Sequence, residues 1–174
     1  MNILRNNNQI IFLFVILFII ISPSCASQEE KLELAKQEVE LIKNKIDTKN
    51  MVTGLAFKDE KRFSYRGHFI DDKLVFIFSD TFIGVTGSAT YMFYYKDGKL
   101  IYFNENSIKV PSNSSGKKQS ILTDIYFDGD QVLESTRVVQ GLFTDVSDEE
   151  IKEIIEISNL LYNKIIEKKQ ALKL

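Results

Sequence analysis

The stretch Thr90–Phe103, with the sequence TYMFYYKDGKLIYF, decides the fold of this chain. Two runs rich in aromatic residues flank Asp97-Gly98. Asp-Gly between apolar runs is a strong hairpin signal, because both residues can adopt positive φ. Neither strand of this hairpin has a clearly polar face, so the pair is either covered on both sides or exposes one side for binding. The residues at which we expect such a binding surface are Tyr91, Tyr94, Tyr102 and Phe103.

Two related stretches lie on either side of this hairpin. HFIDDKLV begins at residue 68 and YFDGDQVL at residue 126, and both align without gaps to YYKDGKLI, which begins at residue 94. The offsets between them are 26 and 32 residues, which is too irregular for a solenoid. We therefore expect three successive hairpins of one antiparallel meander.

The turns also predict a register, because a slip of one residue would move every apolar side chain to the other face of the sheet. In the first hairpin Phe69 faces Leu74 and Tyr65 faces Phe78, which gives one apolar face made of Tyr65, Phe69, Leu74, Phe76 and Phe78. In the central hairpin the predicted pairs are Tyr95–Leu100, Phe93–Tyr102 and Met92–Phe103. On later strands, Arg137 and Asp124 are expected to form a cross-strand ion pair.

The sequence predicts one helix before the sheet and one after it. From Gln28 to about Asp47, apolar residues recur at spacings of three and four, the period of a helical stripe. Fewer than three heptads are present, which favours packing on the protein's own sheet over a coiled coil with a partner. Near the C-terminus, Ser147 and Glu150 have the spacing of a capping box directly before a second apolar stripe, which predicts a helix start.

Composition and pattern together predict an α+β fold. Thirteen Phe and seven Tyr without Trp indicate an aromatic-rich sheet. We expect an antiparallel meander of about six strands flanked by an N-terminal and a C-terminal helix. Residues 1–25 are then a leader, residues 26–48 the first helix, and residues 49–174 the sheet and second helix, in one domain with 26–48. Ser79–Gly87 and Asn104–Ser120 are expected connections between hairpins, the second a mobile loop.

The N-terminus has the pattern of an export signal. Arg5 precedes twelve consecutive apolar residues, Ile10 to Ile21. A transmembrane helix needs about 20 apolar residues, whereas the apolar part of a signal peptide has roughly 7–15. The length therefore predicts a signal peptide.

Small residues and a cysteine follow this apolar run, in the order Ser22-Pro23-Ser24-Cys25-Ala26. The pattern resembles the lipobox of bacterial lipoprotein precursors, with Ser22 where Leu is usual. The resemblance implies that Cys25 is lipidated and anchors an exported protein in the cell membrane or the outer membrane. Alternatively, ordinary cleavage after Ala26 would release a soluble secreted protein. In both cases no internal disulfide can form, because Cys25 is the only cysteine.

The sequence has no recognisable catalytic or metal-binding pattern. His68 is the only histidine. Its alternation places it opposite the aromatic core, where we expect an exposed side chain rather than a catalyst. Asp71-Asp72 and Asp128-x-Asp130 are expected to be turn residues rather than Ca²⁺ ligands. We predict no cofactor and no metal site.

Charge narrows the expected partners. The net charge is −2 and lysines are mixed with glutamates, unlike a surface for nucleic acid. We expect a lipid-anchored protein of the cell envelope that is not an enzyme and that binds an unknown protein partner. The alternatives are a carrier of a small apolar ligand, with the helices closing a sheet face over a pocket, and a hydrolase of envelope polymers that uses Asp71, Asp72 or Asp80.

Overall fold

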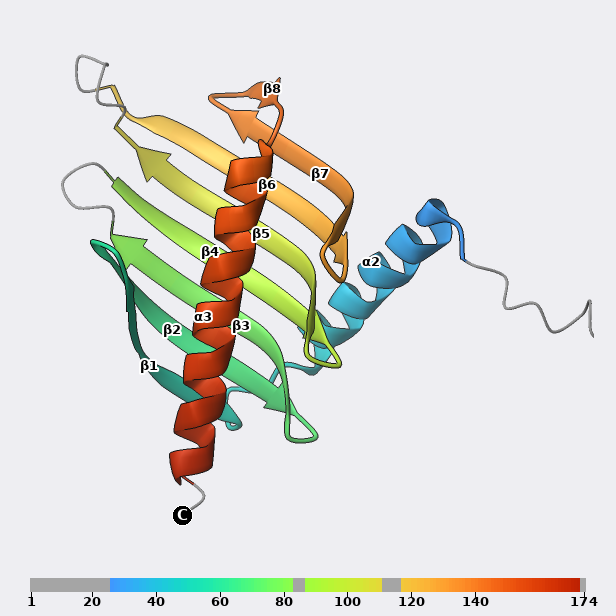
Figure 1. Cartoon of the computed structure of the whole chain (residues 1–174), viewed down its shortest axis with the longest axis vertical. Coiled ribbons are helices and arrows are strands. Elements are labelled where there is room, and N and C mark those ends of the chain that lie inside the picture. The colour runs from blue at the N-terminus through green and yellow to red at the C-terminus, as the bar shows by residue number, and fades with distance from the viewer. Residues whose placement is uncertain (1–25, 83–86, 111–116, 173–174) are drawn as a thin grey trace, which may run out of the picture.

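The computed structural model describes residues 26–82, 87–110 and 117–172, and Figure 1 shows their arrangement. Eight antiparallel strands form one sheet in which each strand pairs with its neighbours in the chain. The strands are β1 (Met51–Lys58), β2 (Lys61–Ile70), β3 (Lys73–Phe82), β4 (Gly87–Lys96), β5 (Lys99–Lys109), β6 (Gln119–Asp128), β7 (Gln131–Val139) and β8 (Leu142–Thr144). The helices are α2 (Gln28–Lys45) and α3 (Asp148–Leu172).

The predicted α+β architecture, with an antiparallel sheet and a helix before and after it, is confirmed. The predicted number of about six strands is wrong, since the sheet has eight. The short β8 follows the turn Gln140-Gly141 and has three exposed residues. Three residues are too few for alternation of apolar and polar positions to be visible in the sequence.

The tight turns form where they were expected. Asp71, Asp72, Asp97 and Gly98 all have positive φ, between 49° and 79°. Each of these pairs joins two strands by a two-residue loop, because Ile70 pairs with Lys73 and Lys96 with Lys99. This conformation suits the right-handed twist of the strands that the turns connect.

A β-bulge recurs at the same aligned position in all three hairpins. The register shifts between His68 and Phe69, between Tyr94 and Tyr95, and between Tyr126 and Phe127. The returning strand carries the extra residue, which is Val75, Ile101 or Leu133. Such a bulge bends the strand and increases its local twist.

The predicted strand register is correct between each turn and its bulge and wrong beyond the bulge. The pairs next to the turns, Phe69–Leu74 and Tyr95–Leu100, are confirmed. Beyond the bulge the predictions are wrong by one residue, and the observed pairs are Tyr65–Ser79, Phe93–Phe103 and Met92–Asn104. Phe76 and Phe78 therefore lie on the opposite face from Tyr65, Phe69 and Leu74.

Strands extend into both stretches predicted as connections. β3 continues to Phe82 and β5 to Lys109, because polar residues there alternate with the pleat of the sheet. The middle of the predicted mobile loop, residues 111–116, lies outside the described residues. The predicted ion pair between Arg137 and Asp124 does not form, because Asp124 pairs in register with Thr136 and Arg137 with Thr123. Neighbours along a strand point to opposite faces, so these two side chains lie on different sides of the sheet.

The two helices cover opposite faces of the sheet (Figure 1). α3 crosses one face with Ile157, Leu161 and Ile165 buried and packs mainly on β1 to β3. A Cβ atom at Gly67 of β2 would lie 2.7 Å from Ile165, so glycine permits this close approach. Among the described residues, neither helix is long and apolar enough to cross a membrane.

α2 packs on the other face with Val39 and Ile42, as predicted for a helix on the protein's own sheet. On this face lies a row of rings in tilted contact, with centroids 4.6 to 5.5 Å apart, formed by His68, Phe76, Tyr94, Tyr102 and Tyr126. The prediction that His68 is exposed is wrong, because this ring lies against Phe76 and is only 7% exposed.

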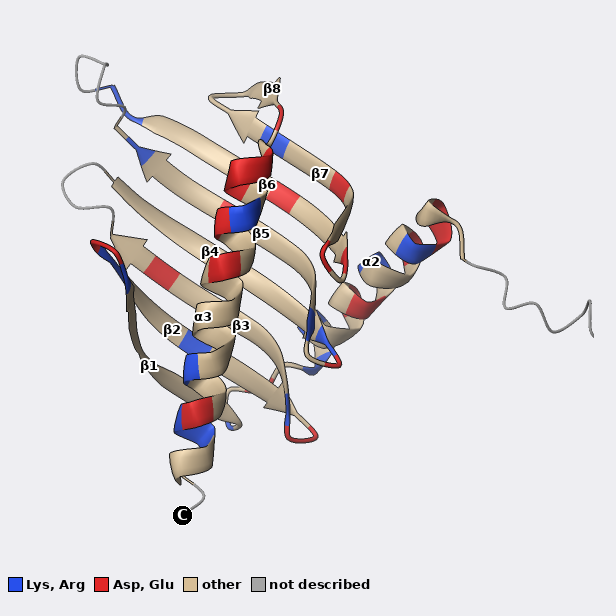
Figure 2. Ribbon diagram, viewed as in Figure 1, with Lys and Arg blue, Asp and Glu red and all other residues tan. Residues whose placement is uncertain are grey.

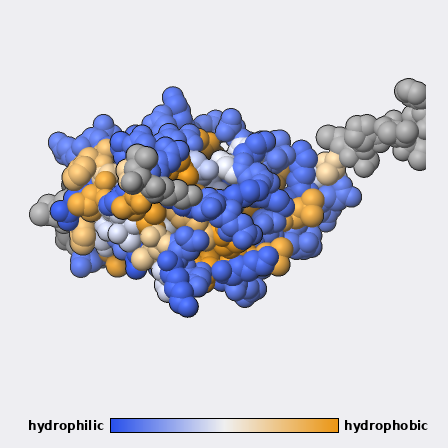
Figure 3. All heavy atoms as spheres, turned by 90° about the horizontal axis from the view of Figure 1, so that it is seen from below, coloured by the Kyte–Doolittle hydropathy of each residue, from blue (hydrophilic) through white to orange (hydrophobic). Residues whose placement is uncertain are grey.

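Hydrogen bonds between side chain and backbone fix the start of each helix. Ser147 and Glu150 form the predicted capping box of α3, and Ser27 and Glu30 form a second one at α2. Charged residues occur along α3 and at several turns (Figure 2), and hydrophilic residues cover most of the end seen in Figure 3. Each helix therefore packs its apolar side on one face of the sheet.

Candidate functional site

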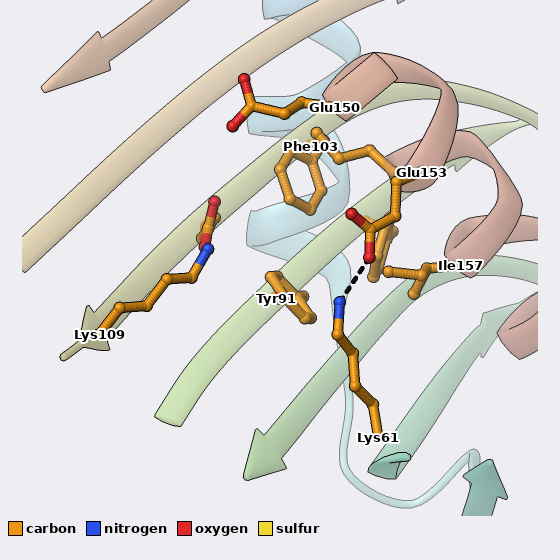
Figure 4. A pocket seen from close by; sticks show the side chains of 10 residues that line it. Lys61, Tyr91, Phe103, Lys109, Glu150, Glu153 and Ile157 are labelled. Atoms are coloured by element: carbon orange, nitrogen blue, oxygen red, sulfur yellow. Dashed lines mark hydrogen bonds and ion pairs between the residues drawn. The ribbon is translucent and has the colours of Figure 1, made fainter. Parts of the chain in front are cut away.

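A pocket of about 260 Å³ lies between the first turns of α3 and the strands β4 and β5. Lys61, at the start of β2, lines it as well. Figure 4 shows several of its side chains. The lining residues are Lys61, Tyr91, Phe93, Phe103, Glu105, Lys109, Glu150, Glu153, Ile154 and Ile157.

The walls of the pocket are aromatic and aliphatic. Tyr91, Phe93 and Phe103 contact one another with ring centroids 5.1 to 6.2 Å apart. These positions follow from the register, since Phe93 faces Phe103 across β4 and β5, and Tyr91 lies two residues along the same face. Ile154 and Ile157 of α3 complete the apolar lining. The walls therefore suit a small apolar body.

The acidic residues of α3 that line the pocket are paired with cations. Lys61 Nζ lies 2.5 Å from Glu153 Oε1, as the dashed line in Figure 4 shows, and this hydrogen bond holds the pKa of Glu153 below its ordinary value. Arg137 donates a hydrogen bond to Glu150, which also accepts one from the Ser147 backbone. Both carboxylates are thus held by the fold itself.

Glu105 differs from these carboxylates because it is buried. Its exposed fraction is 7%, and its Oε2 accepts a hydrogen bond of 3.3 Å from the Thr123 hydroxyl. Its Oε1 is also buried and accepts no hydrogen bond from any described residue. The ammonium of Lys109 lies 3.3 Å from Oε1 as an ion pair and reaches it from a side chain that is 38% exposed. A buried carboxylate oxygen without a hydrogen bond is uncommon in folded proteins.

The hydroxyl of Tyr91 is influenced by the nearby carboxylates of Glu105 and Glu153. Burial raises the pKa of Tyr91, and the negative charges of Glu105 and Glu153 raise it further. The phenol therefore stays neutral at physiological pH and keeps a proton to donate.

Buried polar atoms without a hydrogen bond concentrate on this face. Among the described residues such atoms belong to Ser79, Glu105, Ser107 and Arg137. Ser79, Tyr91, Glu105, Thr123 and Arg137 form one continuous row across β3 to β7. Ser107 lies on the same face, two residues from Glu105 along β5. The α3 face thus combines an apolar core with one row of polar groups, which passes through the pocket at Tyr91 and Glu105.

The residues predicted as a binding surface do not form one surface. Tyr91 and Phe103 line the pocket on the α3 face, whereas Tyr94 and Tyr102 lie beneath α2 on the other face. All four are at most 9% exposed. The alternation of side chains along a strand separates Tyr91 from Tyr94 and Tyr102 from Phe103.

Sequence reasoning missed the charged residues of the pocket. Glu105 was assigned to a connection, although Phe103, Glu105 and Ser107 alternate with Asn104 and Asn106 as strand residues do. Lys61 comes from β2, far from Glu150 and Glu153 of α3 in the chain, and no local signal joins the two elements. The predicted lipidation site, Cys25, lies outside the described residues.

The acidic residues considered for a hydrolase are separated in the fold. Asp72 pairs with Lys169 at 2.7 Å at the turn before β3. Asp80 accepts a hydrogen bond of 3.0 Å from Thr90 on the face opposite the pocket. In the described ranges, no group of three or more His, Cys, Asp or Glu residues is placed to hold a metal ion.

A larger hollow of about 600 Å³ lies on the other side of α3, lined by residues such as Asp130, Val132 and Ile155. All its lining residues are exposed or half-buried, and none brings a buried polar group into the hollow. The smaller pocket is therefore the better candidate site. No family model matches the sequence, and no curated protein or solved structure has significant similarity to it.

Proposed function

We propose that this protein is a non-enzymatic binding protein of the cell envelope, held to a membrane by lipid on Cys25, and that it takes a small, mostly apolar ligand in the pocket beside α3. One observation carries the binding function: one pocket combines buried aromatic walls with a buried carboxylate, one oxygen of which accepts no hydrogen bond. Ligand sites characteristically combine apolar walls with a few placed polar groups. The volume of about 260 Å³ limits the ligand to a small molecule.

The envelope location rests on the leader. Twelve apolar residues precede a small-residue stretch that ends in Cys25. Bacterial lipoproteins carry more than one acyl chain, and each buried CH₂ contributes about 0.8 kcal/mol to membrane binding, so such an anchor is stable.

The binding function is tested on the full-length protein extracted from its own membrane in mild detergent. Native mass spectrometry is expected to find a small bound mass on the wild-type protein. Ile154→Trp fills the pocket and is expected to lose this mass, because Ile154 lines the pocket and is only half-buried. Leu172→Trp, at a side chain that is 70% exposed, is the matched control and is expected to keep it. A wild-type protein without any bound mass, or equal retention by Ile154→Trp, contradicts the proposal.

The anchor is tested separately by growing cells with a fatty-acid probe. Wild-type protein is expected to incorporate the probe and to stay with the membrane fraction after a high-salt wash. Cys25→Ala removes the thiol that would carry the lipid, so it is expected to remain unlabelled. Equal labelling of the two proteins would rule out Cys25 as the site.

A further inference from the structure

We infer that the ligand of this pocket is an organic cation, with an ammonium group that Glu105 binds and an apolar body that lies against the aromatic walls. This inference rests on the proposed binding function and names the chemical class of the ligand. Its starting point is Glu105, the most deeply buried of the three carboxylates that line the pocket.

The environment of Glu105 lacks one hydrogen-bond donor. Thr123 supplies a donor to Oε2, while Oε1 is enclosed, with the Lys109 ammonium 3.3 Å away, and accepts no hydrogen bond from the described residues. Burial of a carboxylate is costly unless its charge is paired and its oxygens accept hydrogen bonds. A ligand with N–H donors would supply the missing hydrogen bond.

Lys109 occupies part of this position from the solvent side. It lies at the end of β5, and its ammonium approaches Oε1 to 3.3 Å without forming a hydrogen bond. Its side chain is 38% exposed, so it can move into solvent when a ligand cation arrives. The position of the Lys109 ammonium shows that a positive charge beside Glu105 Oε1 is favourable.

The aromatic walls favour the same charge. Tyr91, Phe93 and Phe103 surround the space next to Glu105, and in Figure 4 the rings of Tyr91 and Phe103 appear between Lys109 and the Lys61–Glu153 pair. The faces of aromatic rings carry negative potential and attract ammonium groups. A carboxylate beside aromatic rings therefore recognises a cation on a small apolar body.

An anionic ligand fits this arrangement poorly. Lys61 already binds Glu153 at 2.5 Å, and Lys109 faces Glu105. A second negative charge near the buried Glu105 would be repelled in surroundings of low dielectric constant. The lysines of the pocket therefore balance its own carboxylates.

Three probes of the same shape but different charge test the inference by calorimetry at about neutral pH on the full-length protein in detergent, after removal of any bound ligand. The probes are 2-phenylethylammonium, 2-phenylethanol and phenylacetate. We expect the ammonium probe to bind at least about tenfold more tightly than the alcohol, since hydrogen bonds to charged groups are the stronger ones. Phenylacetate is expected to bind most weakly.

Two variants assign the preference to Glu105. Glu105→Gln keeps the shape and the acceptor for Thr123, and is expected to bind the ammonium probe and the alcohol equally. Lys109→Met removes the competing ammonium and is expected to tighten binding of the ammonium probe. Glu134→Gln is the matched control on the α2 side, where Glu134 pairs with Lys36, and it is expected to bind all probes as the wild type does.

The outcomes separate this inference from the proposed function. Equal binding of the ammonium probe and the alcohol by the wild type overturns the cation inference and leaves the binding function in place. Tighter binding of phenylacetate, weakened by Lys109→Met, overturns it in favour of an anion. If none of the probes binds and no mass copurifies with the protein, both the inference and the proposed function are wrong.

Discussion

Raising the pH from about 9 to about 11 is expected to lower the free energy of unfolding by roughly 5 kcal/mol, because four buried tyrosines ionise in the unfolded chain but not in the folded one. Five tyrosines are buried, and the four whose pKa rises most are Tyr91, Tyr94, Tyr95 and Tyr102, each at most 9% exposed. Burial raises the pKa of Tyr94 to about 12. Burial also raises the pKa of the other three, and Tyr102 in addition donates a hydrogen bond to Asp124.

Stability falls with rising pH because the pKa values of these tyrosines are higher in the folded chain than in the unfolded chain. Below about pH 10 both the folded and unfolded chains keep the phenol protons, and the stabilisation is fully present. Above about pH 10 the unfolded chain releases protons that the folded chain retains, so stability falls as the pH rises towards the folded pKa values. Each phenol contributes about 1.4 kcal/mol one unit above its unfolded pKa.

Urea unfolding at several pH values between about 8 and 11, together with phenolate absorbance, measures this effect. Absorbance of the phenolate is expected to rise in step with loss of structure. Tyr94→Phe removes one titrating group and is expected to reduce the pH-dependent loss by about a quarter. A free energy of unfolding that stays constant over this range would show that the rings are not buried as described.

Leu161→Ala is expected to lower the free energy of unfolding by about 2–5 kcal/mol. Leu161 has no exposed surface and lies on α3 between Ile157 and Ile165, which are also buried. Truncation leaves a cavity that the surrounding side chains fill only partly.

The matched control for this variant is Leu41→Ala on α2, where the side chain is 52% exposed. Its expected effect is within about 0.5 kcal/mol. Urea denaturation followed by circular dichroism gives both values. Similar losses for the two variants would mean that α3 does not hold the sheet through Leu161.

The local features of this fold could be predicted from the sequence. Asp97-Gly98 defines its hairpin because the turn conformation depends on two adjacent residues. Ser147 and Glu150 define the start of α3 for the same reason, since a cap involves residues three positions apart. These signals need no knowledge of distant parts of the chain.

The register beyond the bulges could not be predicted, because an extra residue on one strand has no sequence signal as strong as a turn. Val75 and Ile101 are apolar residues that fit either face, so the alternation of the pattern did not reveal the shift. The placement of Glu105 depended on that shift and on the position of α3. A buried acid within a polar stretch was therefore interpreted as part of a connection.

The order of the strands also determines which contacts cost the most conformational entropy to form. Each strand pairs with the next one in the chain, and hairpins with two-residue loops close within microseconds. α3 instead returns across the sheet, and its Glu153 meets Lys61 from 92 residues away. α2 likewise meets β7 across a large loop, since Gln28 donates a hydrogen bond to the Leu133 carbonyl from 105 residues away. Closing such loops costs more conformational entropy than closing any hairpin does. The most non-local contacts of this fold are therefore made by its two helices and not by its eight-stranded sheet.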